Sequence, residues 1–181
     1  SAASIAAVVS FISGFNSNTW KNAVDAATAA DLPTYTRSGT PTGNILTATA
    51  NGQLIIDSRT MFISESIFNG AHSGSGQDFG IYTVSATGSV VAPWQLIARD
   101  DFDSSSDIGA IFRVLKSVPN SRNGNTGWRL TTTGSVTFKT TYLSFVPDSS
   151  LFVYKVFTSS ATWTRPEGIT MLTNLGLRPG A

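Results

Sequence analysis

The residues whose types and spacing come closest to a chemical site are the aspartates and serines between Asp100 and Asp107. Oxygen-bearing side chains recur there at every second position, as in a calcium-binding loop, and hard cations bind such oxygens. Two positions break the pattern, because Ser106 stands where that loop has glycine and Phe112 where it has an acid. The alternative, which the sequence favours, is that these side chains accept hydrogen bonds from their own turn.

The chain has one histidine, His72, in the glycine- and serine-rich segment Asn69–Asp78. A Ser-His-Asp triad would need its general base on this loop, and the G-x-S-x-G motif of many hydrolases is absent. The only glutamates are Glu65 and Glu167, and the aspartates that could complete a glycosidase pair occur mostly in turn-like sequence. The absence of cysteine rules out thiolate chemistry. We therefore predict a protein that is not an enzyme and has no cofactor, with His72 as a solvated loop residue.

Four tryptophans are candidates for stacking on the apolar face of a sugar, because aromatic rings offer large apolar surfaces. Trp94 and Trp128 lie within predicted strands, where packing in the core is the usual explanation. Trp163 lies beside Arg165 in the C-terminal tail and is the stronger candidate for an exposed contact. A host-surface glycan is therefore left open as a partner.

The charge of the chain is low and evenly spread. Charged residues make up 13% of the sequence, the formal net charge is +1, and the twelve Lys and Arg residues form no cluster. The first fourteen residues are mostly apolar, but no basic residue precedes Lys21, and the run is shorter than the ~20 residues that a membrane-spanning helix needs. We expect no nucleic-acid binding, no export signal and no membrane insertion, and the lack of cysteine fits folding in a reducing cytoplasm.

Residues Ser4 to Ser13 are predicted to form a short helix, with Gly14 where a C-cap would stand. Apolar residues occupy the i, i+3, i+4 and i+7 positions of one face, and so short a helix gains most of its stability by packing on another surface. That surface is either another protein, which we favour, or the helix's own domain. The predicted assembly contacts are Ile5, Val8, Val9, Ile12 and Phe15, together with Trp163 and Arg165.

The segment Thr19–Asp31 is rich in alanine and suits a helix, but its residues from Val24 to Thr28 also alternate as in a strand. Thr36–Asn44 contains two glycines and a proline and is predicted to be a linker or long turn. We therefore divide the chain into an N-terminal assembly segment (1–32), a β-domain (33–147), and a C-terminal strand with a docking tail (148–181).

Short alternating segments separated by turn residues run through the β-domain and predict strands. The clearest pair is Ile81–Ser85 and Trp94–Ala98, joined by a turn that contains Gly88. Further strands are predicted at Gln53–Ile56, Thr60–Ile67, Ile111–Leu115, Gly127–Thr131, Ser135–Thr140, Tyr142–Val146 and Leu151–Phe157. Their spacing predicts a mainly β protein, an antiparallel β-sandwich or open barrel, with a short N-terminal helix and an extended C-terminal tail.

Five segments occur in the order found in a β-domain of tailed-bacteriophage tail fibres, and the chain from Trp20 to Phe145 resembles that domain. They are Trp20–Thr28, Asn51–Asp57, Gly80–Val84, Ala92–Leu96 with Arg99–Asp103, and Gly127–Thr132. The chain departs from the family after the Ile-Asp turn, where Ser58 to Asp78 replaces a compact G-D-R-V-L-V-K strand. A second segment, Phe157–Thr170, resembles the opening strand of glycine-rich domains near fibre ends and stops before the glycine-rich body.

The resemblance implies a virion structural protein of the tail fibre, made in the host cytoplasm and located in the tail of the particle. Its implied partners are its own copies, as a homotrimer, and other tail or baseplate proteins, with host attachment as a further role. The family assigns no catalytic residues. The alternative is a head decoration or tail adaptor protein that does not bind a receptor.

Overall fold

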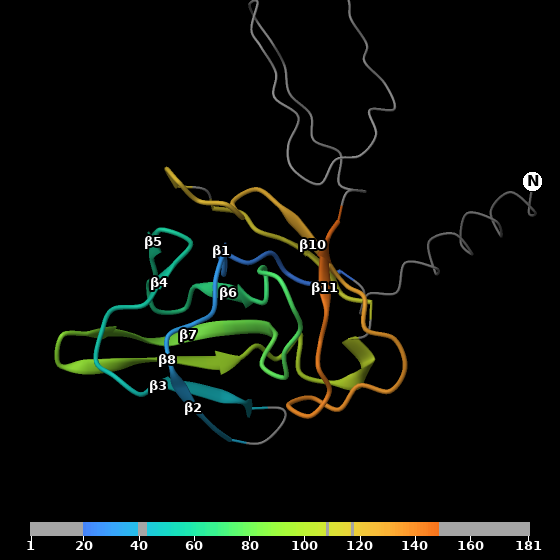
Figure 1. Ribbon diagram of the computed structural model, residues 1–181, viewed down its shortest axis with the longest axis horizontal. Coiled ribbons are helices and arrows are strands. Elements are labelled where there is room, and N and C mark those ends of the chain that lie inside the picture. Colours follow the sequence, from blue (N-terminus) through green and yellow to red (C-terminus); the bar gives the residue numbers. More distant parts are fainter. Residues whose placement is uncertain (1–19, 40–42, 108, 117, 149–181) are drawn as a thin grey trace, which may run out of the picture.

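The computed structural model describes residues 20–39, 43–107, 109–116 and 118–148 (Figure 1). These residues form mostly short strands, with a 3-10 turn at Ser105–Asp107, and most strand pairs are antiparallel. The prediction of a mainly β, antiparallel protein is therefore confirmed. The predicted N-terminal helix, the strand at Leu151–Phe157 and the C-terminal tail lie outside the described residues. Within the described ranges, no helix is long and apolar enough to cross a membrane.

A six-stranded sheet has the order β1-β6-β7-β8-β3-β2. Its strands are β1 (Ala26–Ala27), β6 (Ser66–Asn69), β7 (Gly80–Ser89), β8 (Ala92–Ala98), β3 (Ile45–Ala48) and β2 (Tyr35–Ser38). The long β7–β8 hairpin at its centre contains both members of the clearest predicted pair. Alternate residues of β8 face the core, where Trp94, Leu96 and Ala98 are buried, as the period of a half-buried strand requires.

Gly88 lies inside β7, so its predicted place in the turn is wrong. The turn is formed by Val90 and Val91, since Ser89 pairs with Ala92. Gly88 has φ +73°, and a Cβ atom built on it would stand 1.9 Å from the carbonyl oxygen of Gly52. Glycine is needed there because another part of the backbone passes too close for a side chain.

A three-stranded antiparallel sheet, ordered β11-β10-β9, packs on the six-stranded sheet. Its strands are β9 (Ile111–Arg113), β10 (Gly127–Leu130) and β11 (Phe145–Pro147). Phe68 of β6 lies among Phe112, Trp128 and Phe145, one from each strand, with ring centroids 4.7, 5.5 and 4.6 Å away. We call these four residues the aromatic cluster. Trp94 and Trp128 are both buried, as predicted.

Residues 20–27 run from one sheet to the other. Trp20 forms a parallel bridge to Ile111 of β9, and Val24 forms one to Val114, which directly follows β9. Strand β1 then pairs in parallel with β6. Val24 is fully buried in the core. The sequence left open whether this segment is a helix or a strand, and the structure shows that residues 20–27 are strand-like. They are part of the same folded body as the β-domain.

Other element boundaries differ from the prediction. The expected linker Thr36–Asn44 includes most of β2, which pairs with β3 as a hairpin. The expected strand Thr60–Ile67 is divided between the small hairpin of β4 (Ile55–Ile56) and β5 (Arg59–Thr60) and the strand β6, with Ser64 at φ 68° between them. The prediction of a strand at Ser135–Thr140 is wrong, because Phe138 to Thr140 form a turn with Lys139 at φ 67°.

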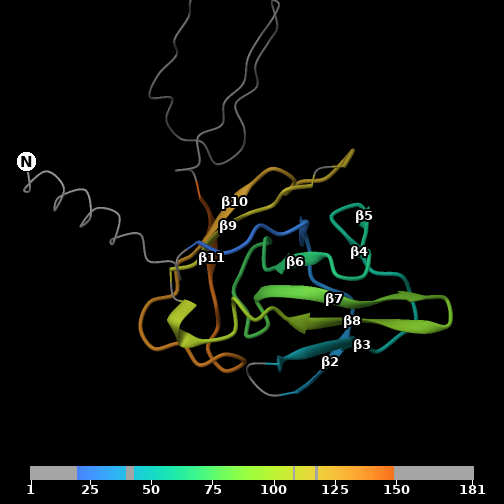
Figure 2. The same ribbon diagram turned by 180° about the vertical axis from the view of Figure 1, so that it is seen from behind.

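The β7–β8 hairpin projects away from the three-stranded sheet, as the front and back views both show (Figures 1 and 2). Trp20 and Asp148, the first and last residues that the structure describes, both lie against that sheet. Trp20 bridges to Ile111, and the Asp148 amide donates to the carbonyl of Gly127 at 2.8 Å. The tip of the hairpin is therefore far from both of these points.

Candidate functional site

The acidic loop and the start of the described chain together form an open depression of about 330 Å³, here called the Trp20 depression. The loop follows β8, and the other wall comes from the residues that bridge to β9. The lining residues are Trp20, Lys21, Asn22, Asp100, Asp101, Ser104, Ser106 and Asp107. Two features singled out in the sequence, a tryptophan and the aspartate run, therefore meet at one place.

The buried carboxylate of Asp107 holds the acidic loop in shape. Its Oδ2 accepts the amide N–H groups of Asp103 and Ser104, each at 3.0 Å, and its Oδ1 pairs with the Lys21 ammonium. Burial, followed by the charge of Asp107, raises the pKa of Asp103. For Asp107 and Ser104, the interpretation that these side chains bond to their own turn is confirmed.

Asp101 is also engaged by neighbouring groups. Arg99 donates from Nη2 to its Oδ2 at 3.0 Å, and the same nitrogen donates to the carbonyl of Asn22 at 2.7 Å. The Asn22 amide N–H donates to the same Oδ2 at 3.3 Å. Asp101 and Asp107 each have a cationic partner. No group of three metal-binding side chains occurs in the described ranges.

Three side chains of the depression are available to a ligand. Trp20 is 45% exposed, whereas Trp94 and Trp128 are at most 7% exposed. Asn22 and Asp100 are exposed, and their side chains have no hydrogen-bond partner among the described residues. The depression is therefore lined mainly by polar groups.

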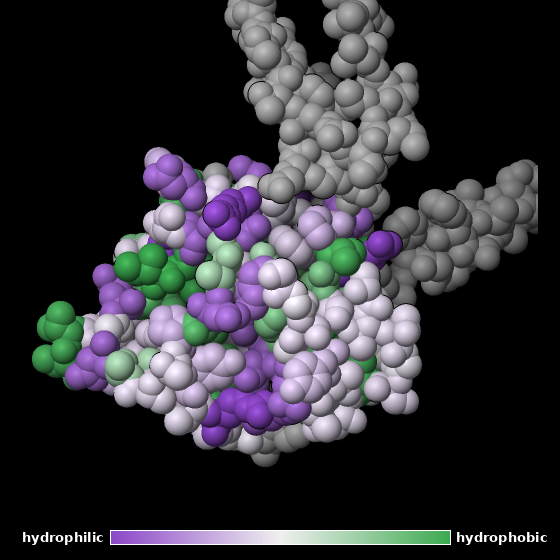
Figure 3. Space-filling view, in the orientation of Figure 1, coloured by the Kyte–Doolittle hydropathy of each residue, from purple (hydrophilic) through white to green (hydrophobic). Residues whose placement is uncertain are grey.

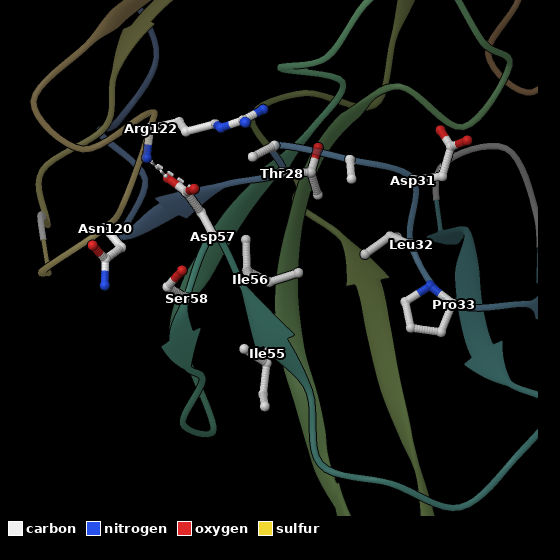
Figure 4. Close-up of a pocket in the computed structure, with 12 residues that line it drawn as sticks. Thr28, Asp31, Leu32, Pro33, Ile55, Ile56, Asp57, Ser58, Asn120 and Arg122 are labelled. Atoms are coloured by element: carbon white, nitrogen blue, oxygen red, sulfur yellow. Dashed lines mark hydrogen bonds between the residues drawn. The ribbon is translucent and has the colours of Figure 1, made fainter.

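A second depression, of about 310 Å³, lies beside the β4–β5 turn and is shown in Figure 4. Leu32, Pro33 and Ile55 provide apolar walls. Asp57, in the left-handed region at φ 48°, accepts the amide N–H of Arg122 at 2.8 Å and that of Asn123 at 2.7 Å. This carboxylate ties the β4–β5 turn to the segment before β10, so we assign it a structural role.

His72 is not the solvated loop residue that was predicted. Its side chain is only 12% exposed, with Nδ1 3.4 Å from the Asp31 carboxylate and the imidazole edge against the ring of Phe79 at 4.9 Å. The glycine- and serine-rich loop folds back over Phe79, and this burial could not be deduced from loop composition. The described contacts of His72 are thus with a carboxylate and a phenyl ring.

Glu65 belongs to a network of charges rather than to an acid–base pair. Its carboxylate pairs with Arg59 and Lys116, and it accepts the Phe62 amide at 2.9 Å. Burial alone would raise the pKa of Glu65, but the hydrogen bonds from Arg59 and Lys116 lower it to about 2. A carboxyl group with so low a pKa is ionised near neutrality and cannot serve as a general acid there. Glu167 lies outside the described residues.

The far end of the β7–β8 hairpin exposes apolar side chains. Val90 and Val91 at its tip are 92% and 79% exposed. Beside it, hydrogen bonds join the backbone of Leu54 to Thr87 and that of Ser64 to Val84. Those neighbouring segments expose further apolar residues, and Figure 3 shows green surface at the hairpin tip and near β4. We define the hairpin end as Ile55, Phe62, Ile63, Val90 and Val91.

Sequence reasoning missed the hairpin end, although a signal was present. Val90 and Val91 are adjacent and lie between two predicted strands. Residues of such a tight turn lie on the surface, so at least one of these valines is expected to be exposed. The predicted assembly contacts Ile5, Val8, Val9, Ile12, Phe15, Trp163 and Arg165 lie outside the described residues. Comparison with family models, with curated proteins and with solved structures found no match to this chain.

Proposed function

We propose that this protein is a structural component of a tailed-bacteriophage virion, located in the tail fibre, where it assembles onto the tail and contributes to contact with the host surface. It is not an enzyme. It is made in the host cytoplasm and joins the particle as a homotrimer.

The observation that carries the proposal is the place of the five fibre-like segments in the fold. Each supplies a strand of the described body, namely β1, β4, β7, β8 and β10 in chain order. Three of these strands, β1, β7 and β8, belong to the six-stranded sheet, and β10 is the central strand of the smaller one. The resemblance therefore concerns parts of the chain that build the described body.

The surface adds support for a role in assembly. The hairpin end presents apolar side chains at a point far from Trp20 and Asp148, and exposed apolar groups of this kind are typical of protein contacts. The low charge of the chain also suits close packing of copies without strong electrostatic repulsion. In a trimeric fibre, several weak host contacts on one particle act together and raise avidity by orders of magnitude.

The first test is the mass of the full chain in solution, followed by gold-labelled antibody on purified particles of the phage that encodes it. We expect a species three times the 19.1 kDa of one chain and label on the fibres. Label on the head, or at the junction of tail and fibre without binding of free protein to cells, would indicate the decoration or adaptor role instead. Particles without label would overturn the proposal of a virion protein.

A further inference from the structure

We propose that Asn51 is a site of spontaneous deamidation, and that the fold selects it over the other Asn-Gly pairs of the chain. The reacting group is the exposed side-chain amide of Asn51, the nucleophile is the backbone nitrogen of Gly52, and the co-reactant is water. The inference goes beyond the proposed function and does not depend on it.

The chemistry follows from the residue types of the pair. The Gly52 nitrogen attacks the side-chain carbonyl carbon of Asn51, and the amide group leaves as ammonia together with the proton of that nitrogen, so that a succinimide ring forms. Water then opens the ring at either carbonyl and gives aspartate or isoaspartate. Glycine favours ring closure, because it has no Cβ atom to obstruct the approach of the two groups.

The chain has three Asn-Gly pairs, which begin at Asn51, Asn69 and Asn123, and all three lie within the described residues. In an unfolded chain the pairs react at comparable rates, since each has glycine as the next residue. In the fold their surroundings differ. Asn69 and Asn123 are 3% and 8% exposed, whereas Asn51 lies at the surface in the segment before β4.

The two buried pairs are held by hydrogen bonds that the reaction would break. The Asn69 side-chain amide donates to the carbonyl of Asp78 at 2.9 Å. The attacking nitrogen of that pair, on Gly70, donates to Thr28 Oγ1 at 2.9 Å. The Asn123 side-chain amide donates to the carbonyl of Thr28 at 3.0 Å. These pairs therefore react only through local opening of the structure, which costs free energy.

Asn51 is not held in this way. Its side chain is exposed and has no hydrogen-bond partner among the described residues, so water reaches the amide and no such bond opposes its rotation. The Gly52 amide donates to the carbonyl of Ala92 at 3.3 Å, which is longer than the usual N–H···O distance. The barrier that the fold adds to ring closure is therefore smaller at Asn51 than at the two buried pairs.

The product changes the backbone beside the β7–β8 hairpin. Isoaspartate adds one methylene group to the main chain directly before Gly52, whose carbonyl lies against Gly88 and whose amide bonds to Ala92. A close contact of this kind does not absorb an added atom without a shift. Both products also carry a carboxylate, which cancels the formal net charge of +1. Deamidation at Asn51 should therefore lower the stability of the fold.

The experiment ages the full chain in mildly alkaline buffer, in the folded state and in urea, and follows conversion by trypsin digestion and mass spectrometry. Trypsin leaves the three pairs in different peptides, 38–59, 60–99 and 123–129, so each rate is read separately. The ratio of the folded to the unfolded rate at each pair removes any difference in intrinsic reactivity. We expect this ratio to be at least about tenfold higher at Asn51 than at either buried pair.

Two results would overturn the assignment of Asn51. One is an equal ratio at all three pairs, or a higher ratio at a buried pair. The other is an absence of conversion at Asn51 in the folded chain over a period in which the chain in urea reacts.

The variant Asn51→Gln tests the effect on the fold. It keeps an amide at the surface, but its cyclisation needs a larger ring and is much slower. Fresh wild type and variant should unfold at the same temperature. After ageing, the midpoint of the wild type should be lower than that of Asn51→Gln by about 2 °C or more. Equal midpoints after full conversion of the wild type would overturn the predicted loss of stability.

Discussion

The aromatic cluster and the hairpin end are held together by different means. In the aromatic cluster, large rings from both sheets fill the space between them, so stability there depends on side-chain volume. At the hairpin end, the backbone of Gly52 approaches Gly88, and the Gly52 amide donates to the Ala92 carbonyl at 3.3 Å. Stability there depends on the absence of a side chain.

The surfaces of the two regions also differ, in their polarity. Beside the aromatic cluster, Asp101 and Asp107 of the acidic loop are paired with arginine, lysine and backbone amides, and a polar depression is left open. The hairpin end has two highly exposed valines at its tip. One region therefore ends in a polar surface and the other in an apolar one. The following substitutions test this contrast.

The largest effect is expected for Phe68→Ala in the aromatic cluster. Removing this ring leaves a cavity against three other aromatic residues and should lower the free energy of unfolding by about 4 kcal/mol. Urea unfolding followed by far-ultraviolet circular dichroism measures it. The exposed Phe62→Ala should change stability by less than about 0.5 kcal/mol. Equal losses in the two variants would contradict the proposed dependence on packing.

Gly88→Ala tests the other region by adding a single methyl group. The new Cβ would collide with the Gly52 carbonyl, and alanine is strained at φ +73°, so we expect a loss of about 3 kcal/mol. Gly134 also has a positive φ, +87°, and a Cβ there meets no atom within 4 Å. Gly134→Ala is thus a control for backbone strain alone and should cost about 1 kcal/mol. If both variants lose the same amount, the close approach to Gly52 is unimportant.

Glu65→Gln removes the centre of the charge network that joins β6 to Arg59 and Lys116. We expect a loss of about 2 kcal/mol at neutral pH, because Arg59 is left largely buried without its carboxylate. Thermal unfolding of the wild type and the variant measures this difference.

The same pair of proteins tests the pH dependence. The pKa of Glu65 is about 2 in the folded state, below the unfolded value of about 4.3, so the stabilisation is present above the unfolded value and is lost as pH falls through about 2. The difference between wild type and Glu65→Gln should therefore shrink between about pH 4.5 and pH 2. A difference that stays constant over this range would show that the Glu65 pKa is not lowered.

Asp57→Ala should cost about 1–2 kcal/mol, because the amides of Arg122 and Asn123 lose their acceptor and alanine is less suited to φ 48°. Asp57→Asn keeps one acceptor oxygen and tolerates this conformation, so it should lose less. Hydrogen exchange of the Asn123 amide reports the contact directly. Unchanged exchange in Asp57→Ala would contradict the tie between the two segments.

The smallest effect on stability is expected for the double substitution Val90→Ser/Val91→Ser at the hairpin tip. Both side chains are largely exposed, so the free energy of unfolding should change by less than about 0.5 kcal/mol. Self-association, measured by sedimentation velocity, should weaken, because apolar contact surface is lost. Unchanged association would mean that this tip is not a contact between copies.

The sequence by itself determined the class of the fold and parts of its core. The alternation in β7 and β8 is local, since each residue's face follows from its neighbours, and it predicted both strands and the burial of Trp94. Turn chemistry likewise predicted that the aspartates before Ile111 bond to their own loop, as the Asp107 contacts confirm.

Only the tertiary structure decided features that depend on which distant segments meet. Residues 20–27 are strand-like because β9 and β6 offer them partners, although their alanine content also suits a helix. Gly88 is required because Gly52 passes beside it, and the His72 side chain is largely covered because Phe79 lies against it. Local patterns carry the period of a strand, but the identity of a partner far along the chain is set by packing of the whole domain.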